Sequence, residues 1–377
     1  MKPRRVWAVA RKEFLHVLRD PRSLGMAVAI PVLMLILFGY ALTLDVDRVP
    51  LVVWDQSATP ASRRLASRFD GSRYFSRVGD VDNYRDLERA IDTRRALVAL
   101  VIPTDFAQRM EAGRDAPVQL ILDGSDSNTA TIALGYAEAL VEGFAQEVVL
   151  EHVRRLGASL PPGPLDVRLR VWFNEELESK NYIIPGLIAV IMMVIAALLT
   201  SLTVAREWER GTMEQLISTP VKGPELILGK LAPYFTIAMF DVLLAVLMGE
   251  FVFDVPLRGD VALLFAMGAV FLVGALSMGI LISTVLKNQL LASQVAMVAT
   301  FLPAFLLSGF MFAIANMPMP IQWITYLIPA RYFVALLKGI YLKGVGLEVL
   351  AGQAALLGAF SVAMVLLAIA RFKKKLV

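Results

Sequence analysis

Long apolar runs separated by short polar turns dominate the second half of the chain. Five runs centre on residues 183–205, 231–253, 261–286, 290–312 and 350–370, and a sixth lies near the N-terminus at 24–44. Each has about the 20 residues that a helix needs to cross a bilayer. We therefore expect an integral membrane α-helical bundle with six transmembrane helices, the first over 23–44 and five more within 181–371.

The first run could instead belong to a cleaved signal peptide. Such a peptide has an apolar core of only ~7–15 residues, followed by small residues at the cleavage site. The run at 24–44 is longer, and its end, Leu42-Thr43-Leu44, lacks that pattern. We interpret it as a retained membrane anchor.

Residues 45–180 follow a different pattern, with short apolar runs and frequent charges. VPLVVWD, RALVALVIP and PVQLILD predict buried strands, whereas PASRRLASRFD, NYRDLERAIDTR and TDFAQRMEAG predict amphipathic helices between them, the last capped by Thr104 or Asp105. Alternation of strands and helices favours an α/β or α+β domain with some parallel pairing. A long helix is expected from Thr129 to the PPGP at 161–164, followed by a strand at VRLRVWF.

The leader, residues 1–22, predicts an amphipathic helix at the membrane surface. Trp7, Ala10, Phe14 and Leu18 recur at helical spacing, while basic residues occupy the other side. Tryptophan is typical of the membrane–water interface. The alternative is a leader that is merely basic and only sets the orientation of the first span.

Composition supports a membrane protein and excludes several functions. Hydrophobic residues make up 57% and charged residues 19%, against ~25% charged in soluble chains. The chain has no cysteine and two distant histidines, His16 and His152, so disulfides, a metal site and a catalytic serine–histidine–acid set are not expected. GPELILGKL, at 223–231, fails the spacing of a phosphate-binding loop, and nothing indicates nucleic-acid binding.

Basic residues predict the orientation, because cytosolic segments carry an excess of lysine and arginine. The leader and the tail, RFKKK within 371–375, are both basic. Both termini, the tail at 372–377 and the turn at 206–220 would be cytosolic in a bacterial inner membrane, with domain 45–180 extracytoplasmic. Residues 314–343 are too polar and proline-broken for a span. They predict outer re-entrant or interfacial helices, with Trp323, Tyr326, Tyr332 and Tyr341 at the interface.

The turn REWERGTMEQLISTP, residues 206–220, is the most informative polar segment. Arg206 with Glu209, and Glu207 with Arg210, have the spacing of i,i+3 ion pairs that extend the preceding helix. Gly211 then breaks the helix. Thr212 and Gln215 predict a capping box for a short helix over 211–219, which Pro220 ends.

This short helix needs a cover for its apolar face. Met213, Leu216 and Ile217 share that face, and a helix of about seven residues, ~10 Å long, is not stable alone in water. Lipid headgroups and a protein partner are the two candidates.

The turn resembles the coupling segment in permease subunits of type-2 ATP-binding-cassette (ABC) transporters. The basic leader, WFNEELESKNYIIPGL, REWERGTMEQLISTPVKGPELILGKL, LLSGFMFAIANMP and YLIPARYF extend the resemblance over nearly the whole chain, which is most similar to bacterial exporters with a large periplasmic domain. The resemblance implies a short helix that sits in a cleft of a separate ATPase subunit. The residues so implicated are Arg206, Glu207, Arg210, Gly211, Thr212, Met213, Glu214, Leu216 and Pro220, with a second contact at Arg11, Lys12 and Arg19.

The same resemblance implies the partners. These are an ABC ATPase that holds ATP and Mg²⁺, a second permease copy that is identical or a sister chain, and in some members a periplasmic adaptor. This chain would need no cofactor of its own. Spans two and five would line the pathway for exporting drugs or other small molecules.

Asp241 is the one carboxylate near the middle of a predicted span. It costs ~2.5–3.5 kcal/mol to insert there, so it is expected to face the bundle or a wet cavity, either in the substrate pathway or as a structural acid. An alternative function is therefore a secondary transporter or ion exchanger that uses Asp241 without an ATPase. A membrane-anchored sensor is a weaker alternative, because six spans exceed what an anchor needs.

Overall fold

The computed structural model describes all residues except 1, 20, 43–47, 156–171, 175–177 and 373–377. The chain forms two compact units: Met1–Thr43 with Arg170–Val377, and Leu44–Leu169 between them in sequence. We call the first the helical unit and the second the inserted domain. The strand expected at VRLRVWF lies largely outside the described residues.

The inserted domain is a four-stranded sheet with helices on both faces. Its strands are β1 (Val49–Asp55), β2 (Phe75–Asp80), β3 (Val98–Ile102) and β4 (Gln119–Leu122), in the order β2-β1-β3-β4. β1 pairs in parallel with both β2 and β3, whereas β3 and β4 are antiparallel. The sequence had indicated an α/β or α+β domain with some parallel pairing, and the sheet confirms this.

Alternate residues of β1 and β3 build two separate cores. Leu51 and Leu100 belong to the core that includes α3 (Pro60–Asp70), α5 (Phe106–Glu111) and α6 (Ser127–Arg155), while Val52 and Ala99 face α4 (Tyr84–Asp92). Successive strand side chains point to opposite faces, so a strand covered on both sides is apolar throughout. This explains why VPLVVWD and RALVALVIP were recognisable as strands.

Two details of this domain differ from expectation. Strand β2 was not predicted, because FSRVGD is polar and lies at the edge of the sheet, where five of its six residues are half-buried or exposed. Asp105 precedes α5 but makes no cap; its carboxylate instead accepts a hydrogen bond from Arg109 Nε.

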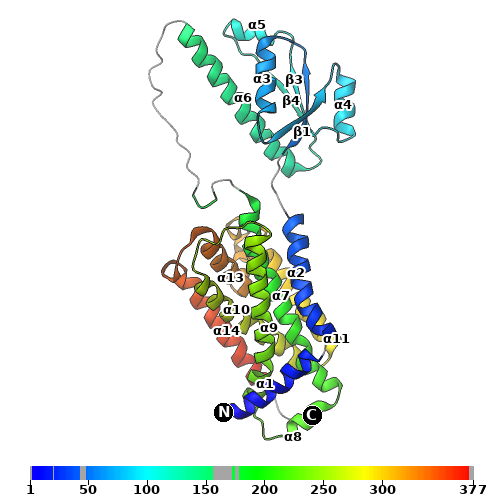
Figure 1. Ribbon diagram of the computed structural model, residues 1–377, viewed down its shortest axis with the longest axis vertical. Helices are drawn as coiled ribbons and strands as arrows, with labels where there is room; N and C mark the ends of the chain where they lie inside the picture. Colours follow the sequence, from blue (N-terminus) through cyan, green and yellow to red (C-terminus); the bar gives the residue numbers. More distant parts are fainter. Residues whose placement is uncertain (1, 20, 43–47, 156–171, 175–177, 373–377) are drawn as a thin grey trace. The chain divides into compact units, whose positions relative to one another are not determined.

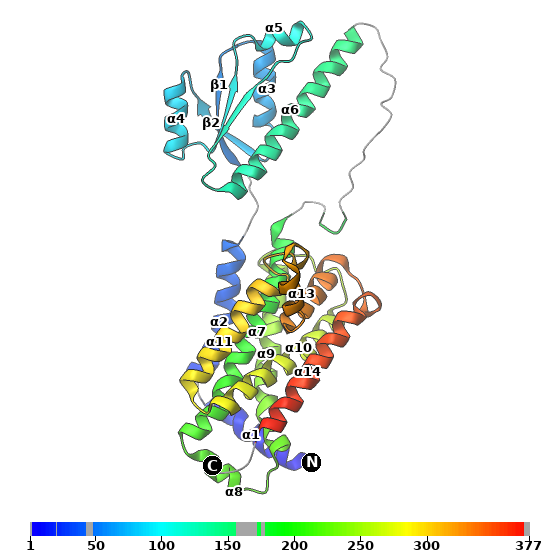
Figure 2. The same ribbon diagram turned by 180° about the vertical axis from the view of Figure 1, so that it is seen from behind.

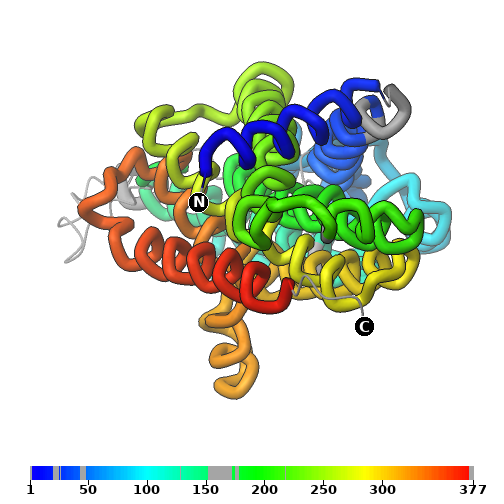
Figure 3. The backbone as a smooth tube through the Cα atoms, turned by 90° about the horizontal axis from the view of Figure 1, so that it is seen from below, coloured from blue at the N-terminus to red at the C-terminus, as the bar shows by residue number. Residues whose placement is uncertain are grey.

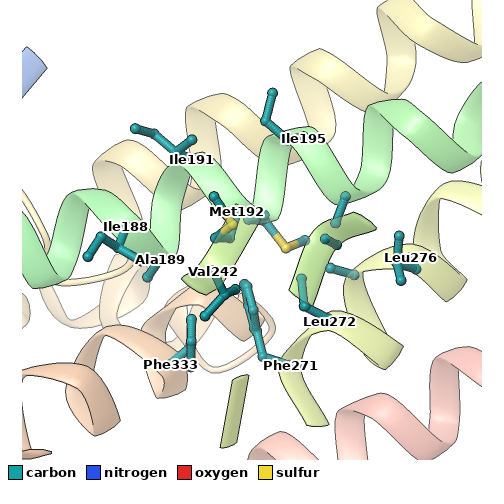
Figure 4. Close-up of a cluster of buried hydrophobic side chains, with 14 of the residues drawn as sticks. Ile188, Ala189, Ile191, Met192, Ile195, Val242, Phe271, Leu272, Leu276 and Phe333 are labelled. Carbon is teal, nitrogen blue, oxygen red and sulfur yellow. The ribbon is translucent and has the colours of Figure 1, made fainter. Parts of the chain in front are cut away.

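The helical unit is built around α7 (Ser179–Glu209). Around it lie α2 (Pro21–Ala41), α9 (Gly223–Phe251), α10 (Val261–Leu286), α11 (Gln289–Leu307) and α13 (Pro329–Lys338), all of which contact it, and α14 (Leu347–Arg371) packs on α10 (Figures 1 and 2). A helix that is apolar on all sides belongs in a core, and the apolar stretch of α7 is 89% buried. In Figure 4, Met192 of α7 lies on the side of Val242, Leu272 and the stacked rings of Phe271 and Phe333, whereas Ile191 and Ile195 extend from the opposite side of α7.

Small residues bring the helices together. A side chain at Gly279 would overlap Thr200 and Ala197 of α7, and one at Gly274 would overlap Ser361 of α14. Small residues are typical where membrane helices approach closely, because packing rather than hydrophobic burial drives their association. Thr200 Oγ1 also donates to the Leu276 carbonyl across this contact, at 2.8 Å.

Five helices among the described residues are long and apolar enough to cross a membrane: α7, α9, α10, α11 and α14. These correspond to spans two to six of the sequence prediction. The first predicted span corresponds to α2, which covers 21 residues. Its described apolar part, Ala27–Ala41, is shorter than any of these five helices.

The segment after α11 forms short helices, as its prolines indicated. These are a 3₁₀ turn at Ile314–Asn316, α12 (Met319–Thr325), α13 and a π turn at Gly339–Lys343. Trp323 and Tyr326 are exposed, which suits an interface. Tyr332 and Tyr341 are buried in the helical unit, so of the four aromatic residues only Trp323 and Tyr326 present exposed rings.

Candidate functional site

The polar turn after α7 contains one isolated short helix, α8 (Thr212–Ser218). Gly211 precedes it with φ +70°, a left-handed conformation that glycine adopts without strain. Thr219 follows in extended conformation, next to Pro220. The helix of seven residues expected from the sequence is therefore present, bounded as predicted by a glycine and a proline.

The hydrogen bonds around α8 differ from the predicted capping box. Gly211, not Thr212, is the N-cap, and no side chain caps the helix. The Thr212 hydroxyl donates to the Glu207 carboxylate instead. Since the left-handed glycine turns the chain back onto α7, Thr212 reaches Glu207 rather than its own helix.

The expected i,i+3 pairs on α7 are also absent from the described contacts. Glu207 pairs with Lys12 at 2.9 Å and with Lys230 at 3.2 Å, and Arg206 Nε donates to Gln289 Oε1 at 3.3 Å. Tertiary partners outcompete these local pairs, because a local pair on a solvated helix contributes only ~0.2–0.5 kcal/mol.

A buried ionic cluster joins α7 and α8 to two other helices. Lys230 of α9 is only 1% exposed, and its Nζ lies 2.8 Å from Glu13 of α1 (Pro3–Leu18) and 3.2 Å from Glu207. Lys12 contacts the same two carboxylates. Buried charges persist only when they are paired. We call Lys12, Glu13, Glu207, Lys230 and Thr212 the ionic cluster.

The pKa of Lys12 reflects this setting. Partial burial works to lower it, but the hydrogen bond to Glu207 and the charges of Glu13 and Glu207 outweigh burial and raise it above its usual value of 10.5. The ammonium form is therefore favoured by the folded structure.

A second buried acid fixes the other end of α1. Glu225 accepts hydrogen bonds from the backbone N–H groups of Lys2, at 2.7 Å, and Lys222, at 2.9 Å. Arg5 lies 3.7 Å from this carboxylate and also donates to the Pro220 carbonyl at 2.6 Å. The chain leaving α8 is thus attached to the start of α1.

A third set of contacts links α7 to α11. Glu209 accepts hydrogen bonds from the backbone and side chain of Gln289. The Lys287 ammonium lies 4.4 Å from the centre of the Trp208 ring. All three sets lie at the end of the bundle across which α1 extends, near α8 (Figure 3).

The two faces of α8 differ in what they contact. Met213 is 1% exposed and packs into the helical unit, and Leu216 is half-buried against the same core. Of the three residues on the expected apolar face, Met213 is therefore covered by this chain and Leu216 partly covered, while the side chain of Ile217 lies outside the described residues. Glu214 and Gln215 are exposed on α8, as are Arg210 and Gly211 just before it.

α1 also has two apolar sides rather than one. Val9, Ala10 and Val17 are buried with Glu13, and Val9 packs on Gly229 of α9. Trp7, at 70% exposed, and Phe14 and Leu18 remain outside, as expected of a helix at a membrane surface. The basic residues implicated in a second contact, Arg11, Lys12 and Arg19, are exposed.

Asp241 lies apart from these residues. It is buried in α9 beside Leu35 of α2 and Ala245, and neither carboxylate oxygen has a hydrogen-bond partner within the described part of the chain. The described residues hold no group of three or more potential metal ligands. In the inserted domain, Asp123 accepts a hydrogen bond from the backbone N–H of Ser125, and Asp126 accepts one from the hydroxyl of Thr129, so both carboxylates shape a local turn.

Sequence reasoning missed three residues of this site: Glu13, Lys230 and Glu225. Each interrupts an otherwise apolar helical face, which is the signal that could have marked them. Their mutual distances could not be inferred, because the residues that pair are separated by about 200 positions.

Comparisons with known proteins give the family of this chain. Residues 21–370 match the family model described as ABC-2 family transporter protein. The chain belongs to the ABC-2 transporter family. It is thus a multi-pass membrane permease of the ABC type, as the sequence resemblance had indicated.

Individual ABC-2 relatives match over most of their length. The chain is 43% identical over 342 residues to the probable multidrug ABC transporter permease YbhS of Escherichia coli (strain K12), which covers 90% of this chain and 89% of the relative. It is 32% identical over 348 residues to the probable multidrug ABC transporter permease YbhR of the same organism, covering 92% of each. The inner membrane transport permease YhhJ is 26% identical over 333 residues, 88% of this chain and 86% of the relative.

Proposed function

We propose that this chain is the transmembrane subunit of an ABC exporter that moves a drug or another small molecule outward, driven by a separate ATPase docked on α8. ATP and Mg²⁺ would be held by the ATPase, and this chain would need no cofactor. The names of two relatives, both described as multidrug permeases, support the substrate class.

The observation that carries the proposal is that α8 combines an exposed polar face with a fixed attachment. Glu214 and Gln215 are free to meet a partner, while Met213 and Thr212 hold the helix on the bundle. A displacement of α8 would pass through Thr212 and Glu207 to α7, and through Lys230 to α9 and α1. A rigid connection of this kind suits the transfer of movement from a motor to spans two and three.

A substitution on α8 that separates ATP hydrolysis from transport would test this role. In the assembled permease–ATPase complex, Glu214→Arg should reduce transport and transport-coupled ATP hydrolysis while leaving the isolated chain folded. Glu348→Arg is the matched control, because Glu348 is an exposed acid in the first turn of α14, far along the chain from α8. Normal coupling in the Glu214→Arg complex would count against α8 as the docking site.

The second contact would be made by Arg11, Lys12 and Arg19 on α1. Their exposure and their position across the same end of the bundle support it (Figure 3). Charge reversal at Arg11 should weaken co-purification of the ATPase. An unchanged yield of complex would remove α1 from the docking surface.

Orientation and span number can be tested directly, since the chain has no cysteine. We propose six spans, with both termini and α8 in the cytosol and the inserted domain outside the bacterial inner membrane. Ser218→Cys should react with a membrane-impermeant maleimide only after permeabilisation, whereas Ser67→Cys should react in intact spheroplasts. The reverse pattern, or equal reaction at both positions, would contradict this topology.

We further propose that two permease copies form one pathway. Exposed apolar residues of α11, including Leu290, Val298 and Leu302, offer a surface for a second copy, identical or a sister chain. α7 is buried within one chain along most of its length, so it could line a pathway only after the helices rearrange. The inserted domain would gate the exit or bind a periplasmic adaptor. Co-purification of differently tagged copies would test the dimer.

The alternative is a secondary transporter that depends on Asp241. Its buried carboxylate without a described hydrogen-bond partner is the only observation in its favour. Whichever function holds, Asp241 lies either in the substrate pathway or within the packing between the helices. Transport by the purified chain without any ATPase would favour the alternative, while Asp241→Asn with full ATP-driven transport would make Asp241 structural.

A further inference from the structure

Two adjoining cavities lie inside the helical unit, and they differ in polarity. The first, about 260 Å³, is partly open, lies against α1, α2, α7 and α9, and is lined mainly by aliphatic side chains such as Ile30, Leu199 and Ile237. The second, about 180 Å³, is lined by the ionic cluster and its neighbours. The two share His16, Thr203, Arg206 and Tyr234, so one end of a bound molecule could be apolar and the other polar.

The polar cavity carries an excess of positive charge. Lys12, Lys230, Arg206 and Arg210 line it together with two acids. The two acids are the ones that Lys12 and Lys230 neutralise within the ionic cluster. Among the described residues no acidic side chain pairs with Arg206 or Arg210, so two guanidinium groups face the cavity uncompensated.

The positive charge continues onto the surface of α1. A groove of about 570 Å³ runs along this helix and shares Lys12 and His16 with the polar cavity. Arg11 and Arg19 border the groove, as does Trp7. Tryptophan beside basic residues is the composition of helices that lie at a membrane surface, where lipid headgroups are within reach.

We propose that these cavities hold one phospholipid with an anionic headgroup. Its acyl chain occupies the apolar cavity, and its phosphate lies between Arg206 and Arg210. Guanidinium groups bind phosphate oxygens with two parallel hydrogen bonds, while the apolar cavity would offer nothing to a small soluble anion. A zwitterionic headgroup fits less well, because its ammonium would add a positive charge beside two unpaired arginines.

The bound lipid would stabilise the position of α1. It would fill the space between α1, α2 and α7 next to the ionic cluster, and so support the attachment of α8. This goes beyond the proposed coupling, because the site lies against α1, α2, α7 and α9 and not on the exposed face of α8.

Photo-crosslinking of the full-length chain tests the site without any ATPase, so its outcome is independent of the proposed coupling. The chain is placed in phosphatidylcholine nanodiscs with a trace of phosphatidylglycerol that carries a diazirine on its acyl chain. Label should concentrate on 195–206 of α7 and 27–30 of α2. Unlabelled phosphatidylglycerol should compete for it, and added phosphatidylcholine should not.

Leu202→Trp fills the apolar cavity while keeping every charge, and it should abolish this labelling. Leu366→Trp is the matched control, since Leu366 is exposed on α14 and lines neither cavity. It should leave the labelling unchanged. Size-exclusion chromatography confirms that both variants are folded.

Arg206→Gln and Arg210→Gln test whether the two guanidinium groups bind the phosphate of the lipid. Arg371→Gln, at the end of α14, is the control. Each of the first two should weaken the preference for phosphatidylglycerol about fivefold, since one basic residue near an anionic membrane surface contributes ~1 kcal/mol. Three results would overturn the proposal: equal competition by phosphatidylcholine, label spread evenly over α11 and α14, or a non-lipid amphiphile as the molecule that co-purifies in the cavity.

Discussion

Replacing Lys230 with methionine tests whether the ionic cluster holds α1 against α7 and α9. Methionine keeps much of the length and apolar bulk of the lysine stem but removes the ammonium. Glu13 would then be buried without its 2.8 Å partner, and Glu207 would keep Lys12, at 2.9 Å, as its charged partner beside the Thr212 hydroxyl. Lys12 also lies 3.6 Å from Glu13, so compensation would be partial.

The loss of stability in Lys230→Met can be worked out from the carboxylate charge that stays buried. Removal of one partner of a buried ion pair costs ~3–5 kcal/mol, because the other charge stays desolvated. With Lys12 as a partial substitute we expect the lower end, about 3 kcal/mol. The free energy of unfolding can be measured by denaturant titration of the detergent-solubilised chain, and protease cleavage between α1 and α2 would report whether α1 has detached.

Two comparisons make the experiment decisive. Lys222→Met is the same substitution at an exposed lysine eight residues earlier, and it should change stability by less than ~0.5 kcal/mol. Glu13→Leu combined with Lys230→Met removes both charges and should recover ~1–2 kcal/mol relative to the sum of the single changes. The reasoning fails if Lys230→Met lowers the free energy of unfolding no more than Lys222→Met does. It also fails if the loss in the double variant equals the sum of the losses in the two single variants.

Three further changes probe other parts of the helical unit. Gly279→Ala should destabilise the chain by ~1–3 kcal/mol through overlap with Thr200, whereas Gly358→Ala, with open space around it, should be neutral or slightly stabilising in the same titration. Gly211→Ala should cost ~1–2 kcal/mol because of its left-handed φ, seen as a lower melting temperature, and equal stability would refute the strain. Because the folded structure raises the pKa of Lys12, its contribution is complete below pH 10.5 and is lost only as pH rises above that value; protease resistance of α1 should follow this profile, and loss near neutral pH would contradict it.

The helices and most strands could be predicted from the sequence because their signals are local. Apolar runs of sufficient length gave all five helices among the described residues that are long and apolar enough to cross a membrane, and continuous apolar stretches gave β1, β3 and β4. β2 escaped because its residues, FSRVGD, are mostly polar and five of the six are half-buried or exposed, so it lacks a continuous apolar stretch. The short helix α8 was found from Gly211 and Pro220, which act on the backbone at their own positions.

The partners of the charged residues could not be predicted in the same way. Local spacing paired Glu207 with Arg210, but folding brings it to Lys12 and Lys230 instead. The capping box at Thr212 failed for the same reason, since Glu207 offers the hydroxyl a carboxylate. Local pairs in a polar turn contribute a few tenths of a kcal/mol, which is too little to resist a buried tertiary contact.

By itself, the sequence determined the membrane class, the alternation of strands and helices in the inserted domain, and the isolation of α8 between a glycine and a proline. Only the tertiary structure decided what α8 rests on and which face it leaves free. The physical reason is the distance along the chain over which each interaction acts. Hydrophobic periodicity and backbone conformation act within one or two turns of a helix, whereas the pairing of Glu13 with Lys230 exists only once α1 and α9 have packed together.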